Sequence, residues 1–328
     1  MAKVTIGMPA YNRAKVLAET IHQILNQTFT DFELIIYNDG STDDTVKIIN
    51  SFNDPRIILI DRPNLGPPHP LNAIYAQARG EYVIILHDHD FFHPTLVEKS
   101  VAALDRHKSA GFVLQGSAWI DEDGVSHYRE MLHDLPVINK GRALGESMLL
   151  HKTSFSSIFH ACCMVRRSAL EQVGMGYSPE FGLYADTDLW LRLLFSFDFI
   201  YLKEVLFKFR TRETVGHFLS NRQFEIQDWQ FNIQRTNAER YFGSDLEKEK
   251  YVQKIIAKKH NAAQREIFLR SIAIRNEHLF QEGLIELKKN SNQPLTIVWC
   301  SRMATLYPVK YVLWQIIPLL NKWRKKLK

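Results

Sequence analysis

Short apolar runs alternate with amphipathic segments over roughly the first 90 residues, and this alternation restricts the fold more than any other feature. The expected strands cover residues 3–8, 32–37, 56–60 and 82–86, with Pro9 ending the first. The helices expected between them cover residues 14–27, 45–52 and 68–79. Strands that alternate with helices form a mainly parallel sheet with right-handed crossovers. We therefore predict an α/β, Rossmann-like sheet flanked by helices, whose loops share one crevice.

A group of carboxylates and imidazoles follows the fourth expected strand, in the segment GEYVIILHDHDFFHP. Its polar members are His87, Asp88, His89, Asp90 and His93. Two carboxylates one residue apart at a strand end suit a hard divalent cation, whereas the imidazoles favour a softer transition metal. The alternative is a turn with solvated carboxylates and partly buried histidines. The position at the carboxyl end of a strand favours a binding site.

Polar residues also end the first two strands. Tyr11, Asn12 and Arg13 follow the first strand, and Asp39 ends the second before Gly40. The chain has neither a Gly-x-Gly-x-x-Gly fingerprint nor a P-loop. An aromatic ring and a carboxylate can instead stack on a base and accept hydrogen bonds from a nucleoside. The alternative is that Asp39 serves only a turn and Tyr11 only packing.

Charge is distributed unevenly along the chain. The net charge is +5, yet residues 294–328 carry +7 with no acidic residue, which leaves −2 on the remainder. A mildly acidic body argues against a nucleic-acid-binding surface. Three cysteines, two of them adjacent, suit a reduced protein, and the N-terminus has no apolar signal segment. We expect a cytoplasmic protein.

The C-terminal third differs in character from the rest. Residues 216–290 are predicted to form a charged helical extension, and residues 291–328 a basic tail. Within the tail, residues 309–328 place apolar side chains at helical spacing among lysines. This stretch is too short to span a bilayer and suits an amphipathic helix on an anionic membrane surface. The alternative is that the tail packs on the body of the protein.

Several ordered motifs resemble the family-2 glycosyltransferases of the GT-A fold. The first part is MPAYNRAKVLAETIHQILNQTFTDFELIIYNDGSTDDT with NLGPPHPLNAIYAQARGEYVIILHDHD, and the second is HACCMVRRSALEQVGMGYSPEFGLYADTDLWLRLLF. The resemblance covers about two thirds of the chain. It implies a GT-A domain over residues 1–215, with a nucleotide-sugar-binding half (1–115) and an acceptor-side half (116–215).

The resemblance also implies roles for particular residues. The nucleotide-binding positions are Pro9, Ala10, Tyr11, Asn12, Arg13, Asp39 and Asp88. The metal-binding positions are Asp88, His89 and Asp90, for Mn²⁺ or Mg²⁺. Asp186 stands at the position of the general base.

The sequence departs from the family pattern at several of these positions. His87 and His89 replace the first two aspartates of the usual Leu-Asp-x-Asp-Asp, so either His89 is a ligand or the flanking carboxylates hold the cation. Leu71 replaces an arginine implicated in gripping diphosphate, and Ala185 replaces the acidic residue before the base. Candidates to neutralise the diphosphate instead are Arg210, Arg212 and His217.

Glycosyl transfer needs a stabilised leaving diphosphate and a base for the attacking hydroxyl. With Asp186 as base opposite the leaving group, the resemblance implies inversion at the anomeric carbon. The expected acceptor is a saccharide or lipid-linked saccharide of a surface polysaccharide, at the inner face of the cell membrane. The alternatives are a nucleotidyltransferase and a catalytically silent nucleotide-sugar-binding or membrane-scaffold protein. Asp186 can also serve as a helix cap, alone or beside a capping Thr187 or Asp188.

Overall fold

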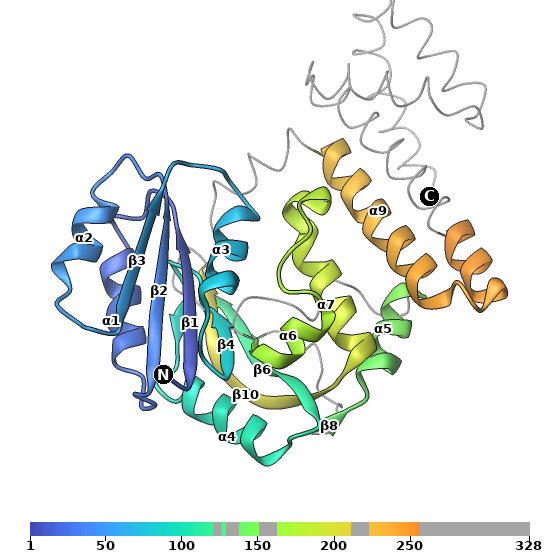
Figure 1. Ribbon diagram of the computed structural model, residues 1–328, viewed down its shortest axis with the longest axis horizontal. Coiled ribbons are helices and arrows are strands. Elements are labelled where there is room, and N and C mark those ends of the chain that lie inside the picture. Colours follow the sequence, from blue (N-terminus) through green and yellow to red (C-terminus); the bar gives the residue numbers. More distant parts are fainter. Residues whose placement is uncertain (121–125, 129–137, 151–162, 211–222, 256–328) are drawn as a thin grey trace, which may run out of the picture. The chain divides into compact units, whose positions relative to one another are not determined.

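The chain divides into two compact units, Met1–Arg212 and Glu213–Lys328. The computed structural model describes residues 1–120, 126–128, 138–150, 163–210 and 223–255 (Figure 1). The strands of the first unit are β1 (Val4–Ala10), β2 (Phe32–Asp39), β3 (Ile57–Arg62), β4 (Tyr82–Ile85), β5 (Phe91–Phe92), β6 (Ala110–Ile120), β7 (Ser126–Tyr128), β8 (Ile138–Asn139), β9 (Met164–Arg166) and β10 (Asp198–Arg210). Its helices are α1 (Leu17–Leu25), α2 (Thr45–Ser51), α3 (His69–Gln77), α4 (Leu96–Arg106), α5 (Gly141–Leu149), α6 (Arg167–Val173) and α7 (Ala185–Ser196), with a 3₁₀ segment at Pro179–Tyr184.

One mixed sheet organises the first unit, in the strand order β3-β2-β1-β4-β9-β6-β10-β5. The ladders that join β1 to β2 and β4, β2 to β3, and β6 to β10 are parallel and long. The antiparallel ladders, including those of β9 with β4 and β6, are short. The sheet confirms the predicted α/β architecture, mixed and mainly parallel, with every predicted strand and helix of the first 86 residues present.

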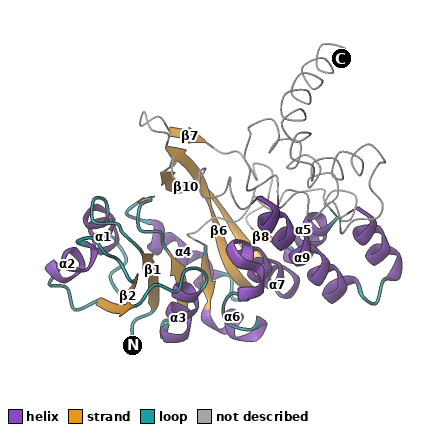
Figure 2. Ribbon diagram, turned by 90° about the horizontal axis from the view of Figure 1, so that it is seen from above, coloured by secondary structure: helices purple, strands orange, loops and turns teal. Residues whose placement is uncertain are grey.

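Helices cover both faces of the sheet (Figure 2). On one face, Val4, Ile6 and Met8 of β1 are fully buried in the core cluster that also contains apolar residues of α1 and α4. Each such buried side chain contributes about 1.5–3 kcal/mol to stability. On the other face, Gly7 lies directly beneath α3, because a Cβ at this position would come within 2.3 Å of the Ile74 side chain. A side chain at position 7 would therefore push α3 away from the sheet.

The strand order places a switch point between β1 and β4. From β1 the chain moves outward through β2 and β3, and then returns to the other side of β1 as β4. The loops that leave β1 and β4 therefore diverge at the carboxyl edge of the sheet, where open α/β sheets bind ligands.

The expectation that Pro9 ends the first strand is wrong, because β1 continues to Ala10 and pairs with β2 throughout. The ladder between β1 and β4 stops at Gly7. The backbone nitrogen of Pro9, two residues further on, faces the side of β4, where no ladder continues, so the missing N–H removes no ladder hydrogen bond.

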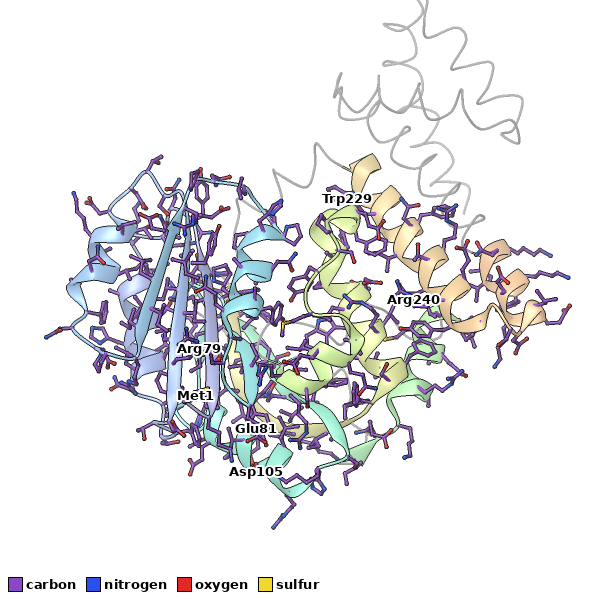
Figure 3. The ribbon with its side chains drawn as sticks, in the orientation of Figure 1. Met1, Arg79, Glu81, Asp105, Trp229 and Arg240 are labelled. Atoms are coloured by element: carbon purple, nitrogen blue, oxygen red, sulfur yellow. The ribbon has the colours of Figure 1, made fainter. Side chains whose placement is uncertain are left out.

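An ion-pair network lies at the opposite, amino edge of the sheet. Lys3 Nζ lies 2.8 Å from Asp105 Oδ2, and the Tyr82 hydroxyl donates to Asp105 Oδ1 at 2.7 Å. Arg166 in turn donates to the Tyr82 oxygen at 3.2 Å. Figure 3 shows Asp105 near Glu81, which precedes β4. We refer to Lys3, Tyr82, Asp105 and Arg166 as the amino-edge network.

The second unit is helical where it is described. It contains α9 (Gln223–Phe242) and a further helical segment at 246–255, both within the predicted helical extension. Ile233, Phe242 and Val252 are buried. Among the described residues, no helix combines the length and apolarity needed to cross a bilayer. The predicted tail at 291–328 lies outside the described residues, and the boundary after residue 215 stays a prediction.

Candidate functional site

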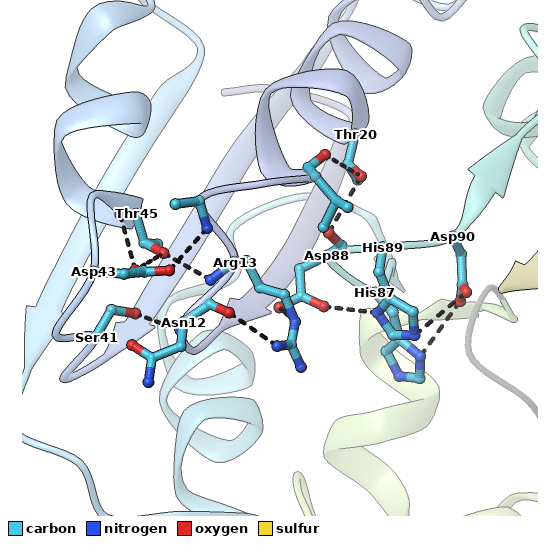
Figure 4. A network of polar contacts seen from close by, with 12 residues as sticks. Asn12, Arg13, Thr20, Ser41, Asp43, Thr45, His87, Asp88, His89 and Asp90 are labelled. Carbon is cyan, nitrogen blue, oxygen red and sulfur yellow. Dashed lines mark hydrogen bonds and ion pairs between the residues drawn. The ribbon is translucent and has the colours of Figure 1, made fainter. Parts of the chain in front are cut away.

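The loop after β1 is fastened to the loop after β2 by polar contacts (Figure 4). Asn12 has a φ of 52°, a left-handed conformation that asparagine tolerates better than most residues. Its N–H donates to Ser41 Oγ at 2.9 Å, and its Oδ1 accepts from the Thr42 N–H at 2.8 Å. The Arg13 N–H donates to Thr45 Oγ1 at 2.8 Å. These contacts fix the backbone of residues 12 and 13 and so aim the Arg13 side chain.

Arg13 connects this loop to the segment that follows β4. Its Nε lies 3.0 Å from Asp88 Oδ2. The other carboxylate oxygen of Asp88 lies 2.7 Å from His89 Nδ1. The Thr20 hydroxyl of α1 donates to the Asp88 carbonyl at 3.2 Å. The loops on the two sides of the switch point are therefore joined through Asp88.

His87, His89 and Asp90 form a compact cluster beside Asp88, which we call the His/Asp cluster (Figure 4). One ligand atom from each residue lies within 4.8 Å of the other two. His87 Nδ1 and His89 Nε2 each lie 3.5 Å from a different oxygen of Asp90. The two imidazoles are stacked, with centroids 5.7 Å apart and planes inclined by 6°. Two imidazoles and one carboxylate are a donor set that binds divalent transition metals.

Asp90 is the buried member of the His/Asp cluster, at 1% exposure. Its Oδ1 accepts the Arg210 N–H at 3.1 Å, whereas its Oδ2 is buried and accepts no hydrogen bond within good distance. Burial by itself would raise the pKa of Asp90, but contact with His87, with smaller contributions from His89 and the Arg210 N–H, outweighs burial and lowers that pKa. An ionised carboxylate with a buried oxygen that accepts no hydrogen bond fits a metal ligand.

Asp39 fastens a third loop. Its two carboxylate oxygens accept the N–H groups of Leu65 and Gly66 at 2.9 and 3.0 Å. Its carbonyl oxygen accepts from the Asn64 side chain at 2.9 Å. Asp39 thus holds the loop after β3 against the end of β2, while each carboxylate oxygen keeps a second lone pair for a ligand. Its predicted nucleotide role stays a prediction.

Asp186 is the second residue of α7 and is partly buried. Its Oδ1 accepts the Thr187 N–H at 2.7 Å, one of the amides at a helix start that lack an intrahelical partner. Asp186 thus bonds one free amide, as the capping alternative expected. Tyr184 occupies the N-cap position itself, so none of Asp186, Thr187 and Asp188 is the N-cap residue, and Asp188 pairs with Arg192 at 2.8 Å.

Burial raises the pKa of the Asp186 carboxyl above the ordinary value for aspartate, while the Thr187 N–H and the charge of His87 act in the opposite direction. Asp186 and His87 are thus within electrostatic reach of one another. Burial, with a smaller contribution from Asp186, raises the pKa of the nearby Tyr75 to about 12. A carboxylate of raised pKa near other titratable groups is typical of functional sites.

Two side chains hold the segment before the 3₁₀ turn. Asn72 of α3 donates to the Tyr177 carbonyl at 2.9 Å and accepts the Tyr177 N–H at 2.7 Å. Arg192 of α7 donates to the carbonyls of Val173 and Gly176 at 2.8 and 2.7 Å. This segment is thus anchored on both sides, and the hydroxyl of Tyr177 lies 3.4 Å from that of Tyr75.

Residues 5–174, just over half of the chain, match the family described as Glycosyl transferase family 2. The chain belongs to this family. EpsE of Bacillus subtilis (strain 168), which is named as a glycosyltransferase, is 31% identical over 216 residues. The match covers 63% of this chain and 73% of EpsE.

Longer relatives match over a shorter region. The chondroitin synthase of Pasteurella multocida (strain Pm70) is 35% identical over 123 residues, which are 37% of this chain and 13% of the synthase. The chain spans less than a fifth of the chondroitin and hyaluronan synthases that it matches. The crystal structure of S. aureus TarS 1-349 in complex with UDP-GlcNAc has a TM-score of 0.63 at 17% identity, covering 86% of this chain and 79% of that one. This similarity supports the GT-A fold.

The structure brings together most positions implied by the family-2 resemblance. Pro9 and Ala10 end β1, Tyr11 is exposed beside them, and the remaining nucleotide positions line the same edge of the sheet. The structure groups His87, rather than Asp88, with His89 and Asp90. The short spacing of His87 and His89 before Asp90 in the sequence could have indicated this grouping. The family pattern instead indicated Asp88 as a metal-binding position.

The basic residues expected near the diphosphate are only partly described. The Arg210 guanidinium lies over the Phe91 ring, 4.4 Å from its centroid, and 3.2 Å from Glu19. Arg212 and His217 lie outside the described residues. Their proposed contact with the diphosphate stays a prediction.

Proposed function

We propose that this protein is an inverting glycosyltransferase, which moves a sugar from a nucleotide-sugar donor to a hydroxyl of a saccharide or lipid-linked saccharide. The observation that carries the proposal is the placement of Asp186. Its partly buried carboxyl of raised pKa lies within electrostatic reach of His87, one member of the cluster that follows β4. A base and a set of diphosphate-stabilising groups are the two requirements of the reaction.

The donor side is formed by the loops after β1, β2 and β4. Tyr11 is 43% exposed, and Asp39, which is 5% exposed, keeps a second lone pair on each carboxylate oxygen. These groups suit a base and a ribose. The likeness in fold to TarS, solved with UDP-GlcNAc, supports a nucleotide-sugar donor.

The His/Asp cluster fits a divalent metal, which when bound would neutralise charge on the leaving diphosphate as a Lewis acid. Arg13 and Asp88 hold the cluster in place from the loop after β1. Asp186 removes the proton from the acceptor hydroxyl as this oxygen attacks the anomeric carbon. Because the chain's own base acts on the attacking oxygen directly, one displacement occurs and the configuration inverts.

The proposed acceptor rests on the relatives and on the basic tail. A chondroitin synthase and a hyaluronan synthase are among the relatives, which supports a growing polysaccharide as acceptor. The tail at 309–328 carries apolar and basic residues at helical spacing, which suits an anionic membrane surface carrying a lipid-linked saccharide.

The proposal is tested with a panel of uridine and guanosine diphosphate sugars, incubated with the full chain and Mn²⁺. Water serves as the acceptor, and the sugar released is followed by proton NMR before it mutarotates. We expect one nucleotide series to be hydrolysed, with first-formed sugar of the opposite anomeric configuration to the donor. Retention would contradict the inverting mechanism.

Binding of nucleotide sugars without turnover, with or without a saccharide acceptor, would favour the silent binder. Release of pyrophosphate from nucleoside triphosphates would favour the nucleotidyltransferase.

A further inference from the structure

We propose that His87, His89 and Asp90 form a metal centre that prefers transition metals from Mn²⁺ to Zn²⁺ over Mg²⁺, with Asp88 as a positioning residue and not a ligand. The inference deepens the proposed function and rests on it only for the role of the metal at the donor diphosphate. It revises the expected ligand set of Asp88, His89 and Asp90.

Asp88 orients the imidazole of His89. The Nδ1 of His89 lies 2.7 Å from Asp88 Oδ1. A carboxylate only accepts, so Nδ1 carries a hydrogen and donates it, which leaves Nε2 as the ring nitrogen that can bind a metal. Histidines that ligate metals commonly donate their other ring N–H to a carboxylate in this way.

Ring nitrogens of His87 and His89 face the carboxylate oxygens of Asp90. The Nε2 of His89 lies 3.5 Å from Asp90 Oδ1, and the Nδ1 of His87 lies 3.5 Å from Asp90 Oδ2. Asp90 is buried at 1% exposure, and its Oδ2 accepts no hydrogen bond. Oδ1 of Asp90 already accepts the Arg210 N–H, whereas Oδ2 and the Nε2 of His89 are acceptors that a cation between them would satisfy. Metal–ligand bonds of about 2.0–2.2 Å are within reach of small rotations of these side chains.

Asp88 is not a ligand in this proposal, because both of its carboxylate oxygens already have partners. Its two carboxylate oxygens are directed at different partners, Oδ1 at His89 and Oδ2 at the Arg13 Nε at 3.0 Å. The Arg13 guanidinium therefore competes with any cation for Oδ2. The order Arg13, Asp88, His89 is a chain of contacts that runs from the loop after β1 to the ligand atom of His89.

The donor set of two imidazoles and one carboxylate determines which metal binds. Mg²⁺ prefers oxygen ligands in octahedral geometry and binds imidazole poorly. Imidazole suits Fe²⁺, Co²⁺ and Zn²⁺, and affinity for nitrogen and oxygen sites rises from Mn²⁺ towards the later metals. Two imidazoles beside one carboxylate thus select against Mg²⁺.

The test is calorimetric titration of the chelator-treated full chain with Mn²⁺, Co²⁺, Zn²⁺ and Mg²⁺, without nucleotide. We expect Mn²⁺ to bind at least about tenfold more tightly than Mg²⁺, and Co²⁺ and Zn²⁺ more tightly than Mn²⁺. Bound Co²⁺ should acquire visible absorption from nitrogen ligation. Equal affinity for Mg²⁺ and Mn²⁺, or no saturable binding of any metal, would overturn the proposal.

Four variants assign the roles. His89→Ala should abolish Co²⁺ absorption, and Asp88→Asn should lower Mn²⁺ affinity about 10- to 100-fold while leaving the ligand count intact. His87→Asp should shift the preference towards Mg²⁺. His93→Ala is the matched control, because His93 is exposed, contacts Thr95 at 2.9 Å and lies outside the cluster. Unchanged binding in His89→Ala, with an unchanged circular dichroism spectrum, would contradict the ligand assignment.

The outcomes separate this inference from the proposed function. Hydrolysis of a nucleotide sugar together with equal Mg²⁺ and Mn²⁺ affinity would refute the metal centre and keep the glycosyltransferase. Selective binding of transition metals with neither binding nor turnover of any nucleotide sugar would keep the metal centre and refute the glycosyltransferase.

Discussion

The two edges of the sheet both hold carboxylates among cationic groups, but they satisfy them differently. At the amino edge, each oxygen of Asp105 receives a donor, one from Lys3 and one from Tyr82. These hydrogen bonds hold the pKa of Asp105 at about 2. At the carboxyl edge, Asp90 keeps a buried oxygen that accepts no hydrogen bond, and burial raises the pKa of Asp186.

With the proposed function, the difference separates an edge that serves stability from an edge that serves chemistry. In the amino-edge network, donors and acceptors match, so the groups stabilise the fold as they stand. At the carboxyl edge, the buried Oδ2 of Asp90 has no hydrogen-bond partner at normal distance, and the Asp186 carboxyl of raised pKa lies in the first turn of a helix. Such locally unfavourable arrangements are expected where a ligand completes the interactions. The predictions below test this contrast with matched substitutions at the two edges.

The largest expected effect is on catalysis. Asp186→Asn should lower the rate of sugar transfer about 10²- to 10⁴-fold, the contribution of a general base, while leaving binding of the donor unchanged. Asp105→Asn at the amino edge should leave the rate within about twofold once folded protein is equalised. Both rates are measured by release of nucleoside diphosphate. A loss of similar size in both variants would mean that the two edges do not differ in function.

The next effect is on stability and belongs to the amino edge. Asp105→Asn should lower the free energy of unfolding by about 1–2 kcal/mol, because the Lys3 ion pair is lost and the Tyr82 hydroxyl keeps a weaker acceptor. Urea unfolding followed by circular dichroism measures the change. Asp44→Asn is the control, since Asp44 and its partner Lys47 are 66% and 83% exposed in their side chains and such pairs contribute little. Equal effects of the two substitutions would contradict the structural role of Asp105.

A pH series should resolve the electrostatic part of that loss. The pKa of Asp105 is about 2 in the folded protein and about 3.9 in an unfolded chain. Its contribution is therefore full above about pH 4 and is lost as the pH falls towards 2. Since the side chain is 35% exposed, we expect about 1 kcal/mol. Urea unfolding at pH 7, 4 and 2.5 should show the wild type and Asp105→Asn converging, and a constant gap would contradict the pKa argument.

The sheet was predictable because its pattern is redundant. Four apolar runs of strand length alternate with segments of helical periodicity, and all of them indicate the same parallel sheet. An error in one strand boundary therefore does not alter the predicted topology. The error at Pro9 shows the limit: whether a proline ends a strand depends on whether its neighbour still pairs there. That information lies in the register of β1 with β4 and not in the residues around Pro9.

The candidate site was predictable in its location but only partly in its contacts. That loops after β1, β2 and β4 converge follows from topology. The partner of Asp88 could not be foreseen, because it depends on the Asn12 backbone turning Arg13 across the switch point. The same holds for Asn72 and Tyr177, which are far apart in sequence yet exchange two hydrogen bonds.

The smallest predicted effect is the sharpest test of the contrast, because its sign is opposite at the two edges. A carboxyl whose pKa is raised by folding destabilises the native state while it is ionised, and this cost disappears as the pH falls through the raised value. In Asp186→Asn the amide oxygen can still accept the Thr187 N–H, but no charge is buried. We therefore expect this variant to be more stable than the wild type at pH 7, by about 0.5 kcal/mol. The gain should vanish in acid, where the wild-type carboxyl is protonated. Urea unfolding at pH 7 and at pH 2.5, below the unfolded pKa of about 3.9, measures both points, beside Asp105→Asn. If Asp186→Asn instead loses stability as Asp105→Asn does, Asp186 serves the fold, and its position at the helix start is explained by capping alone.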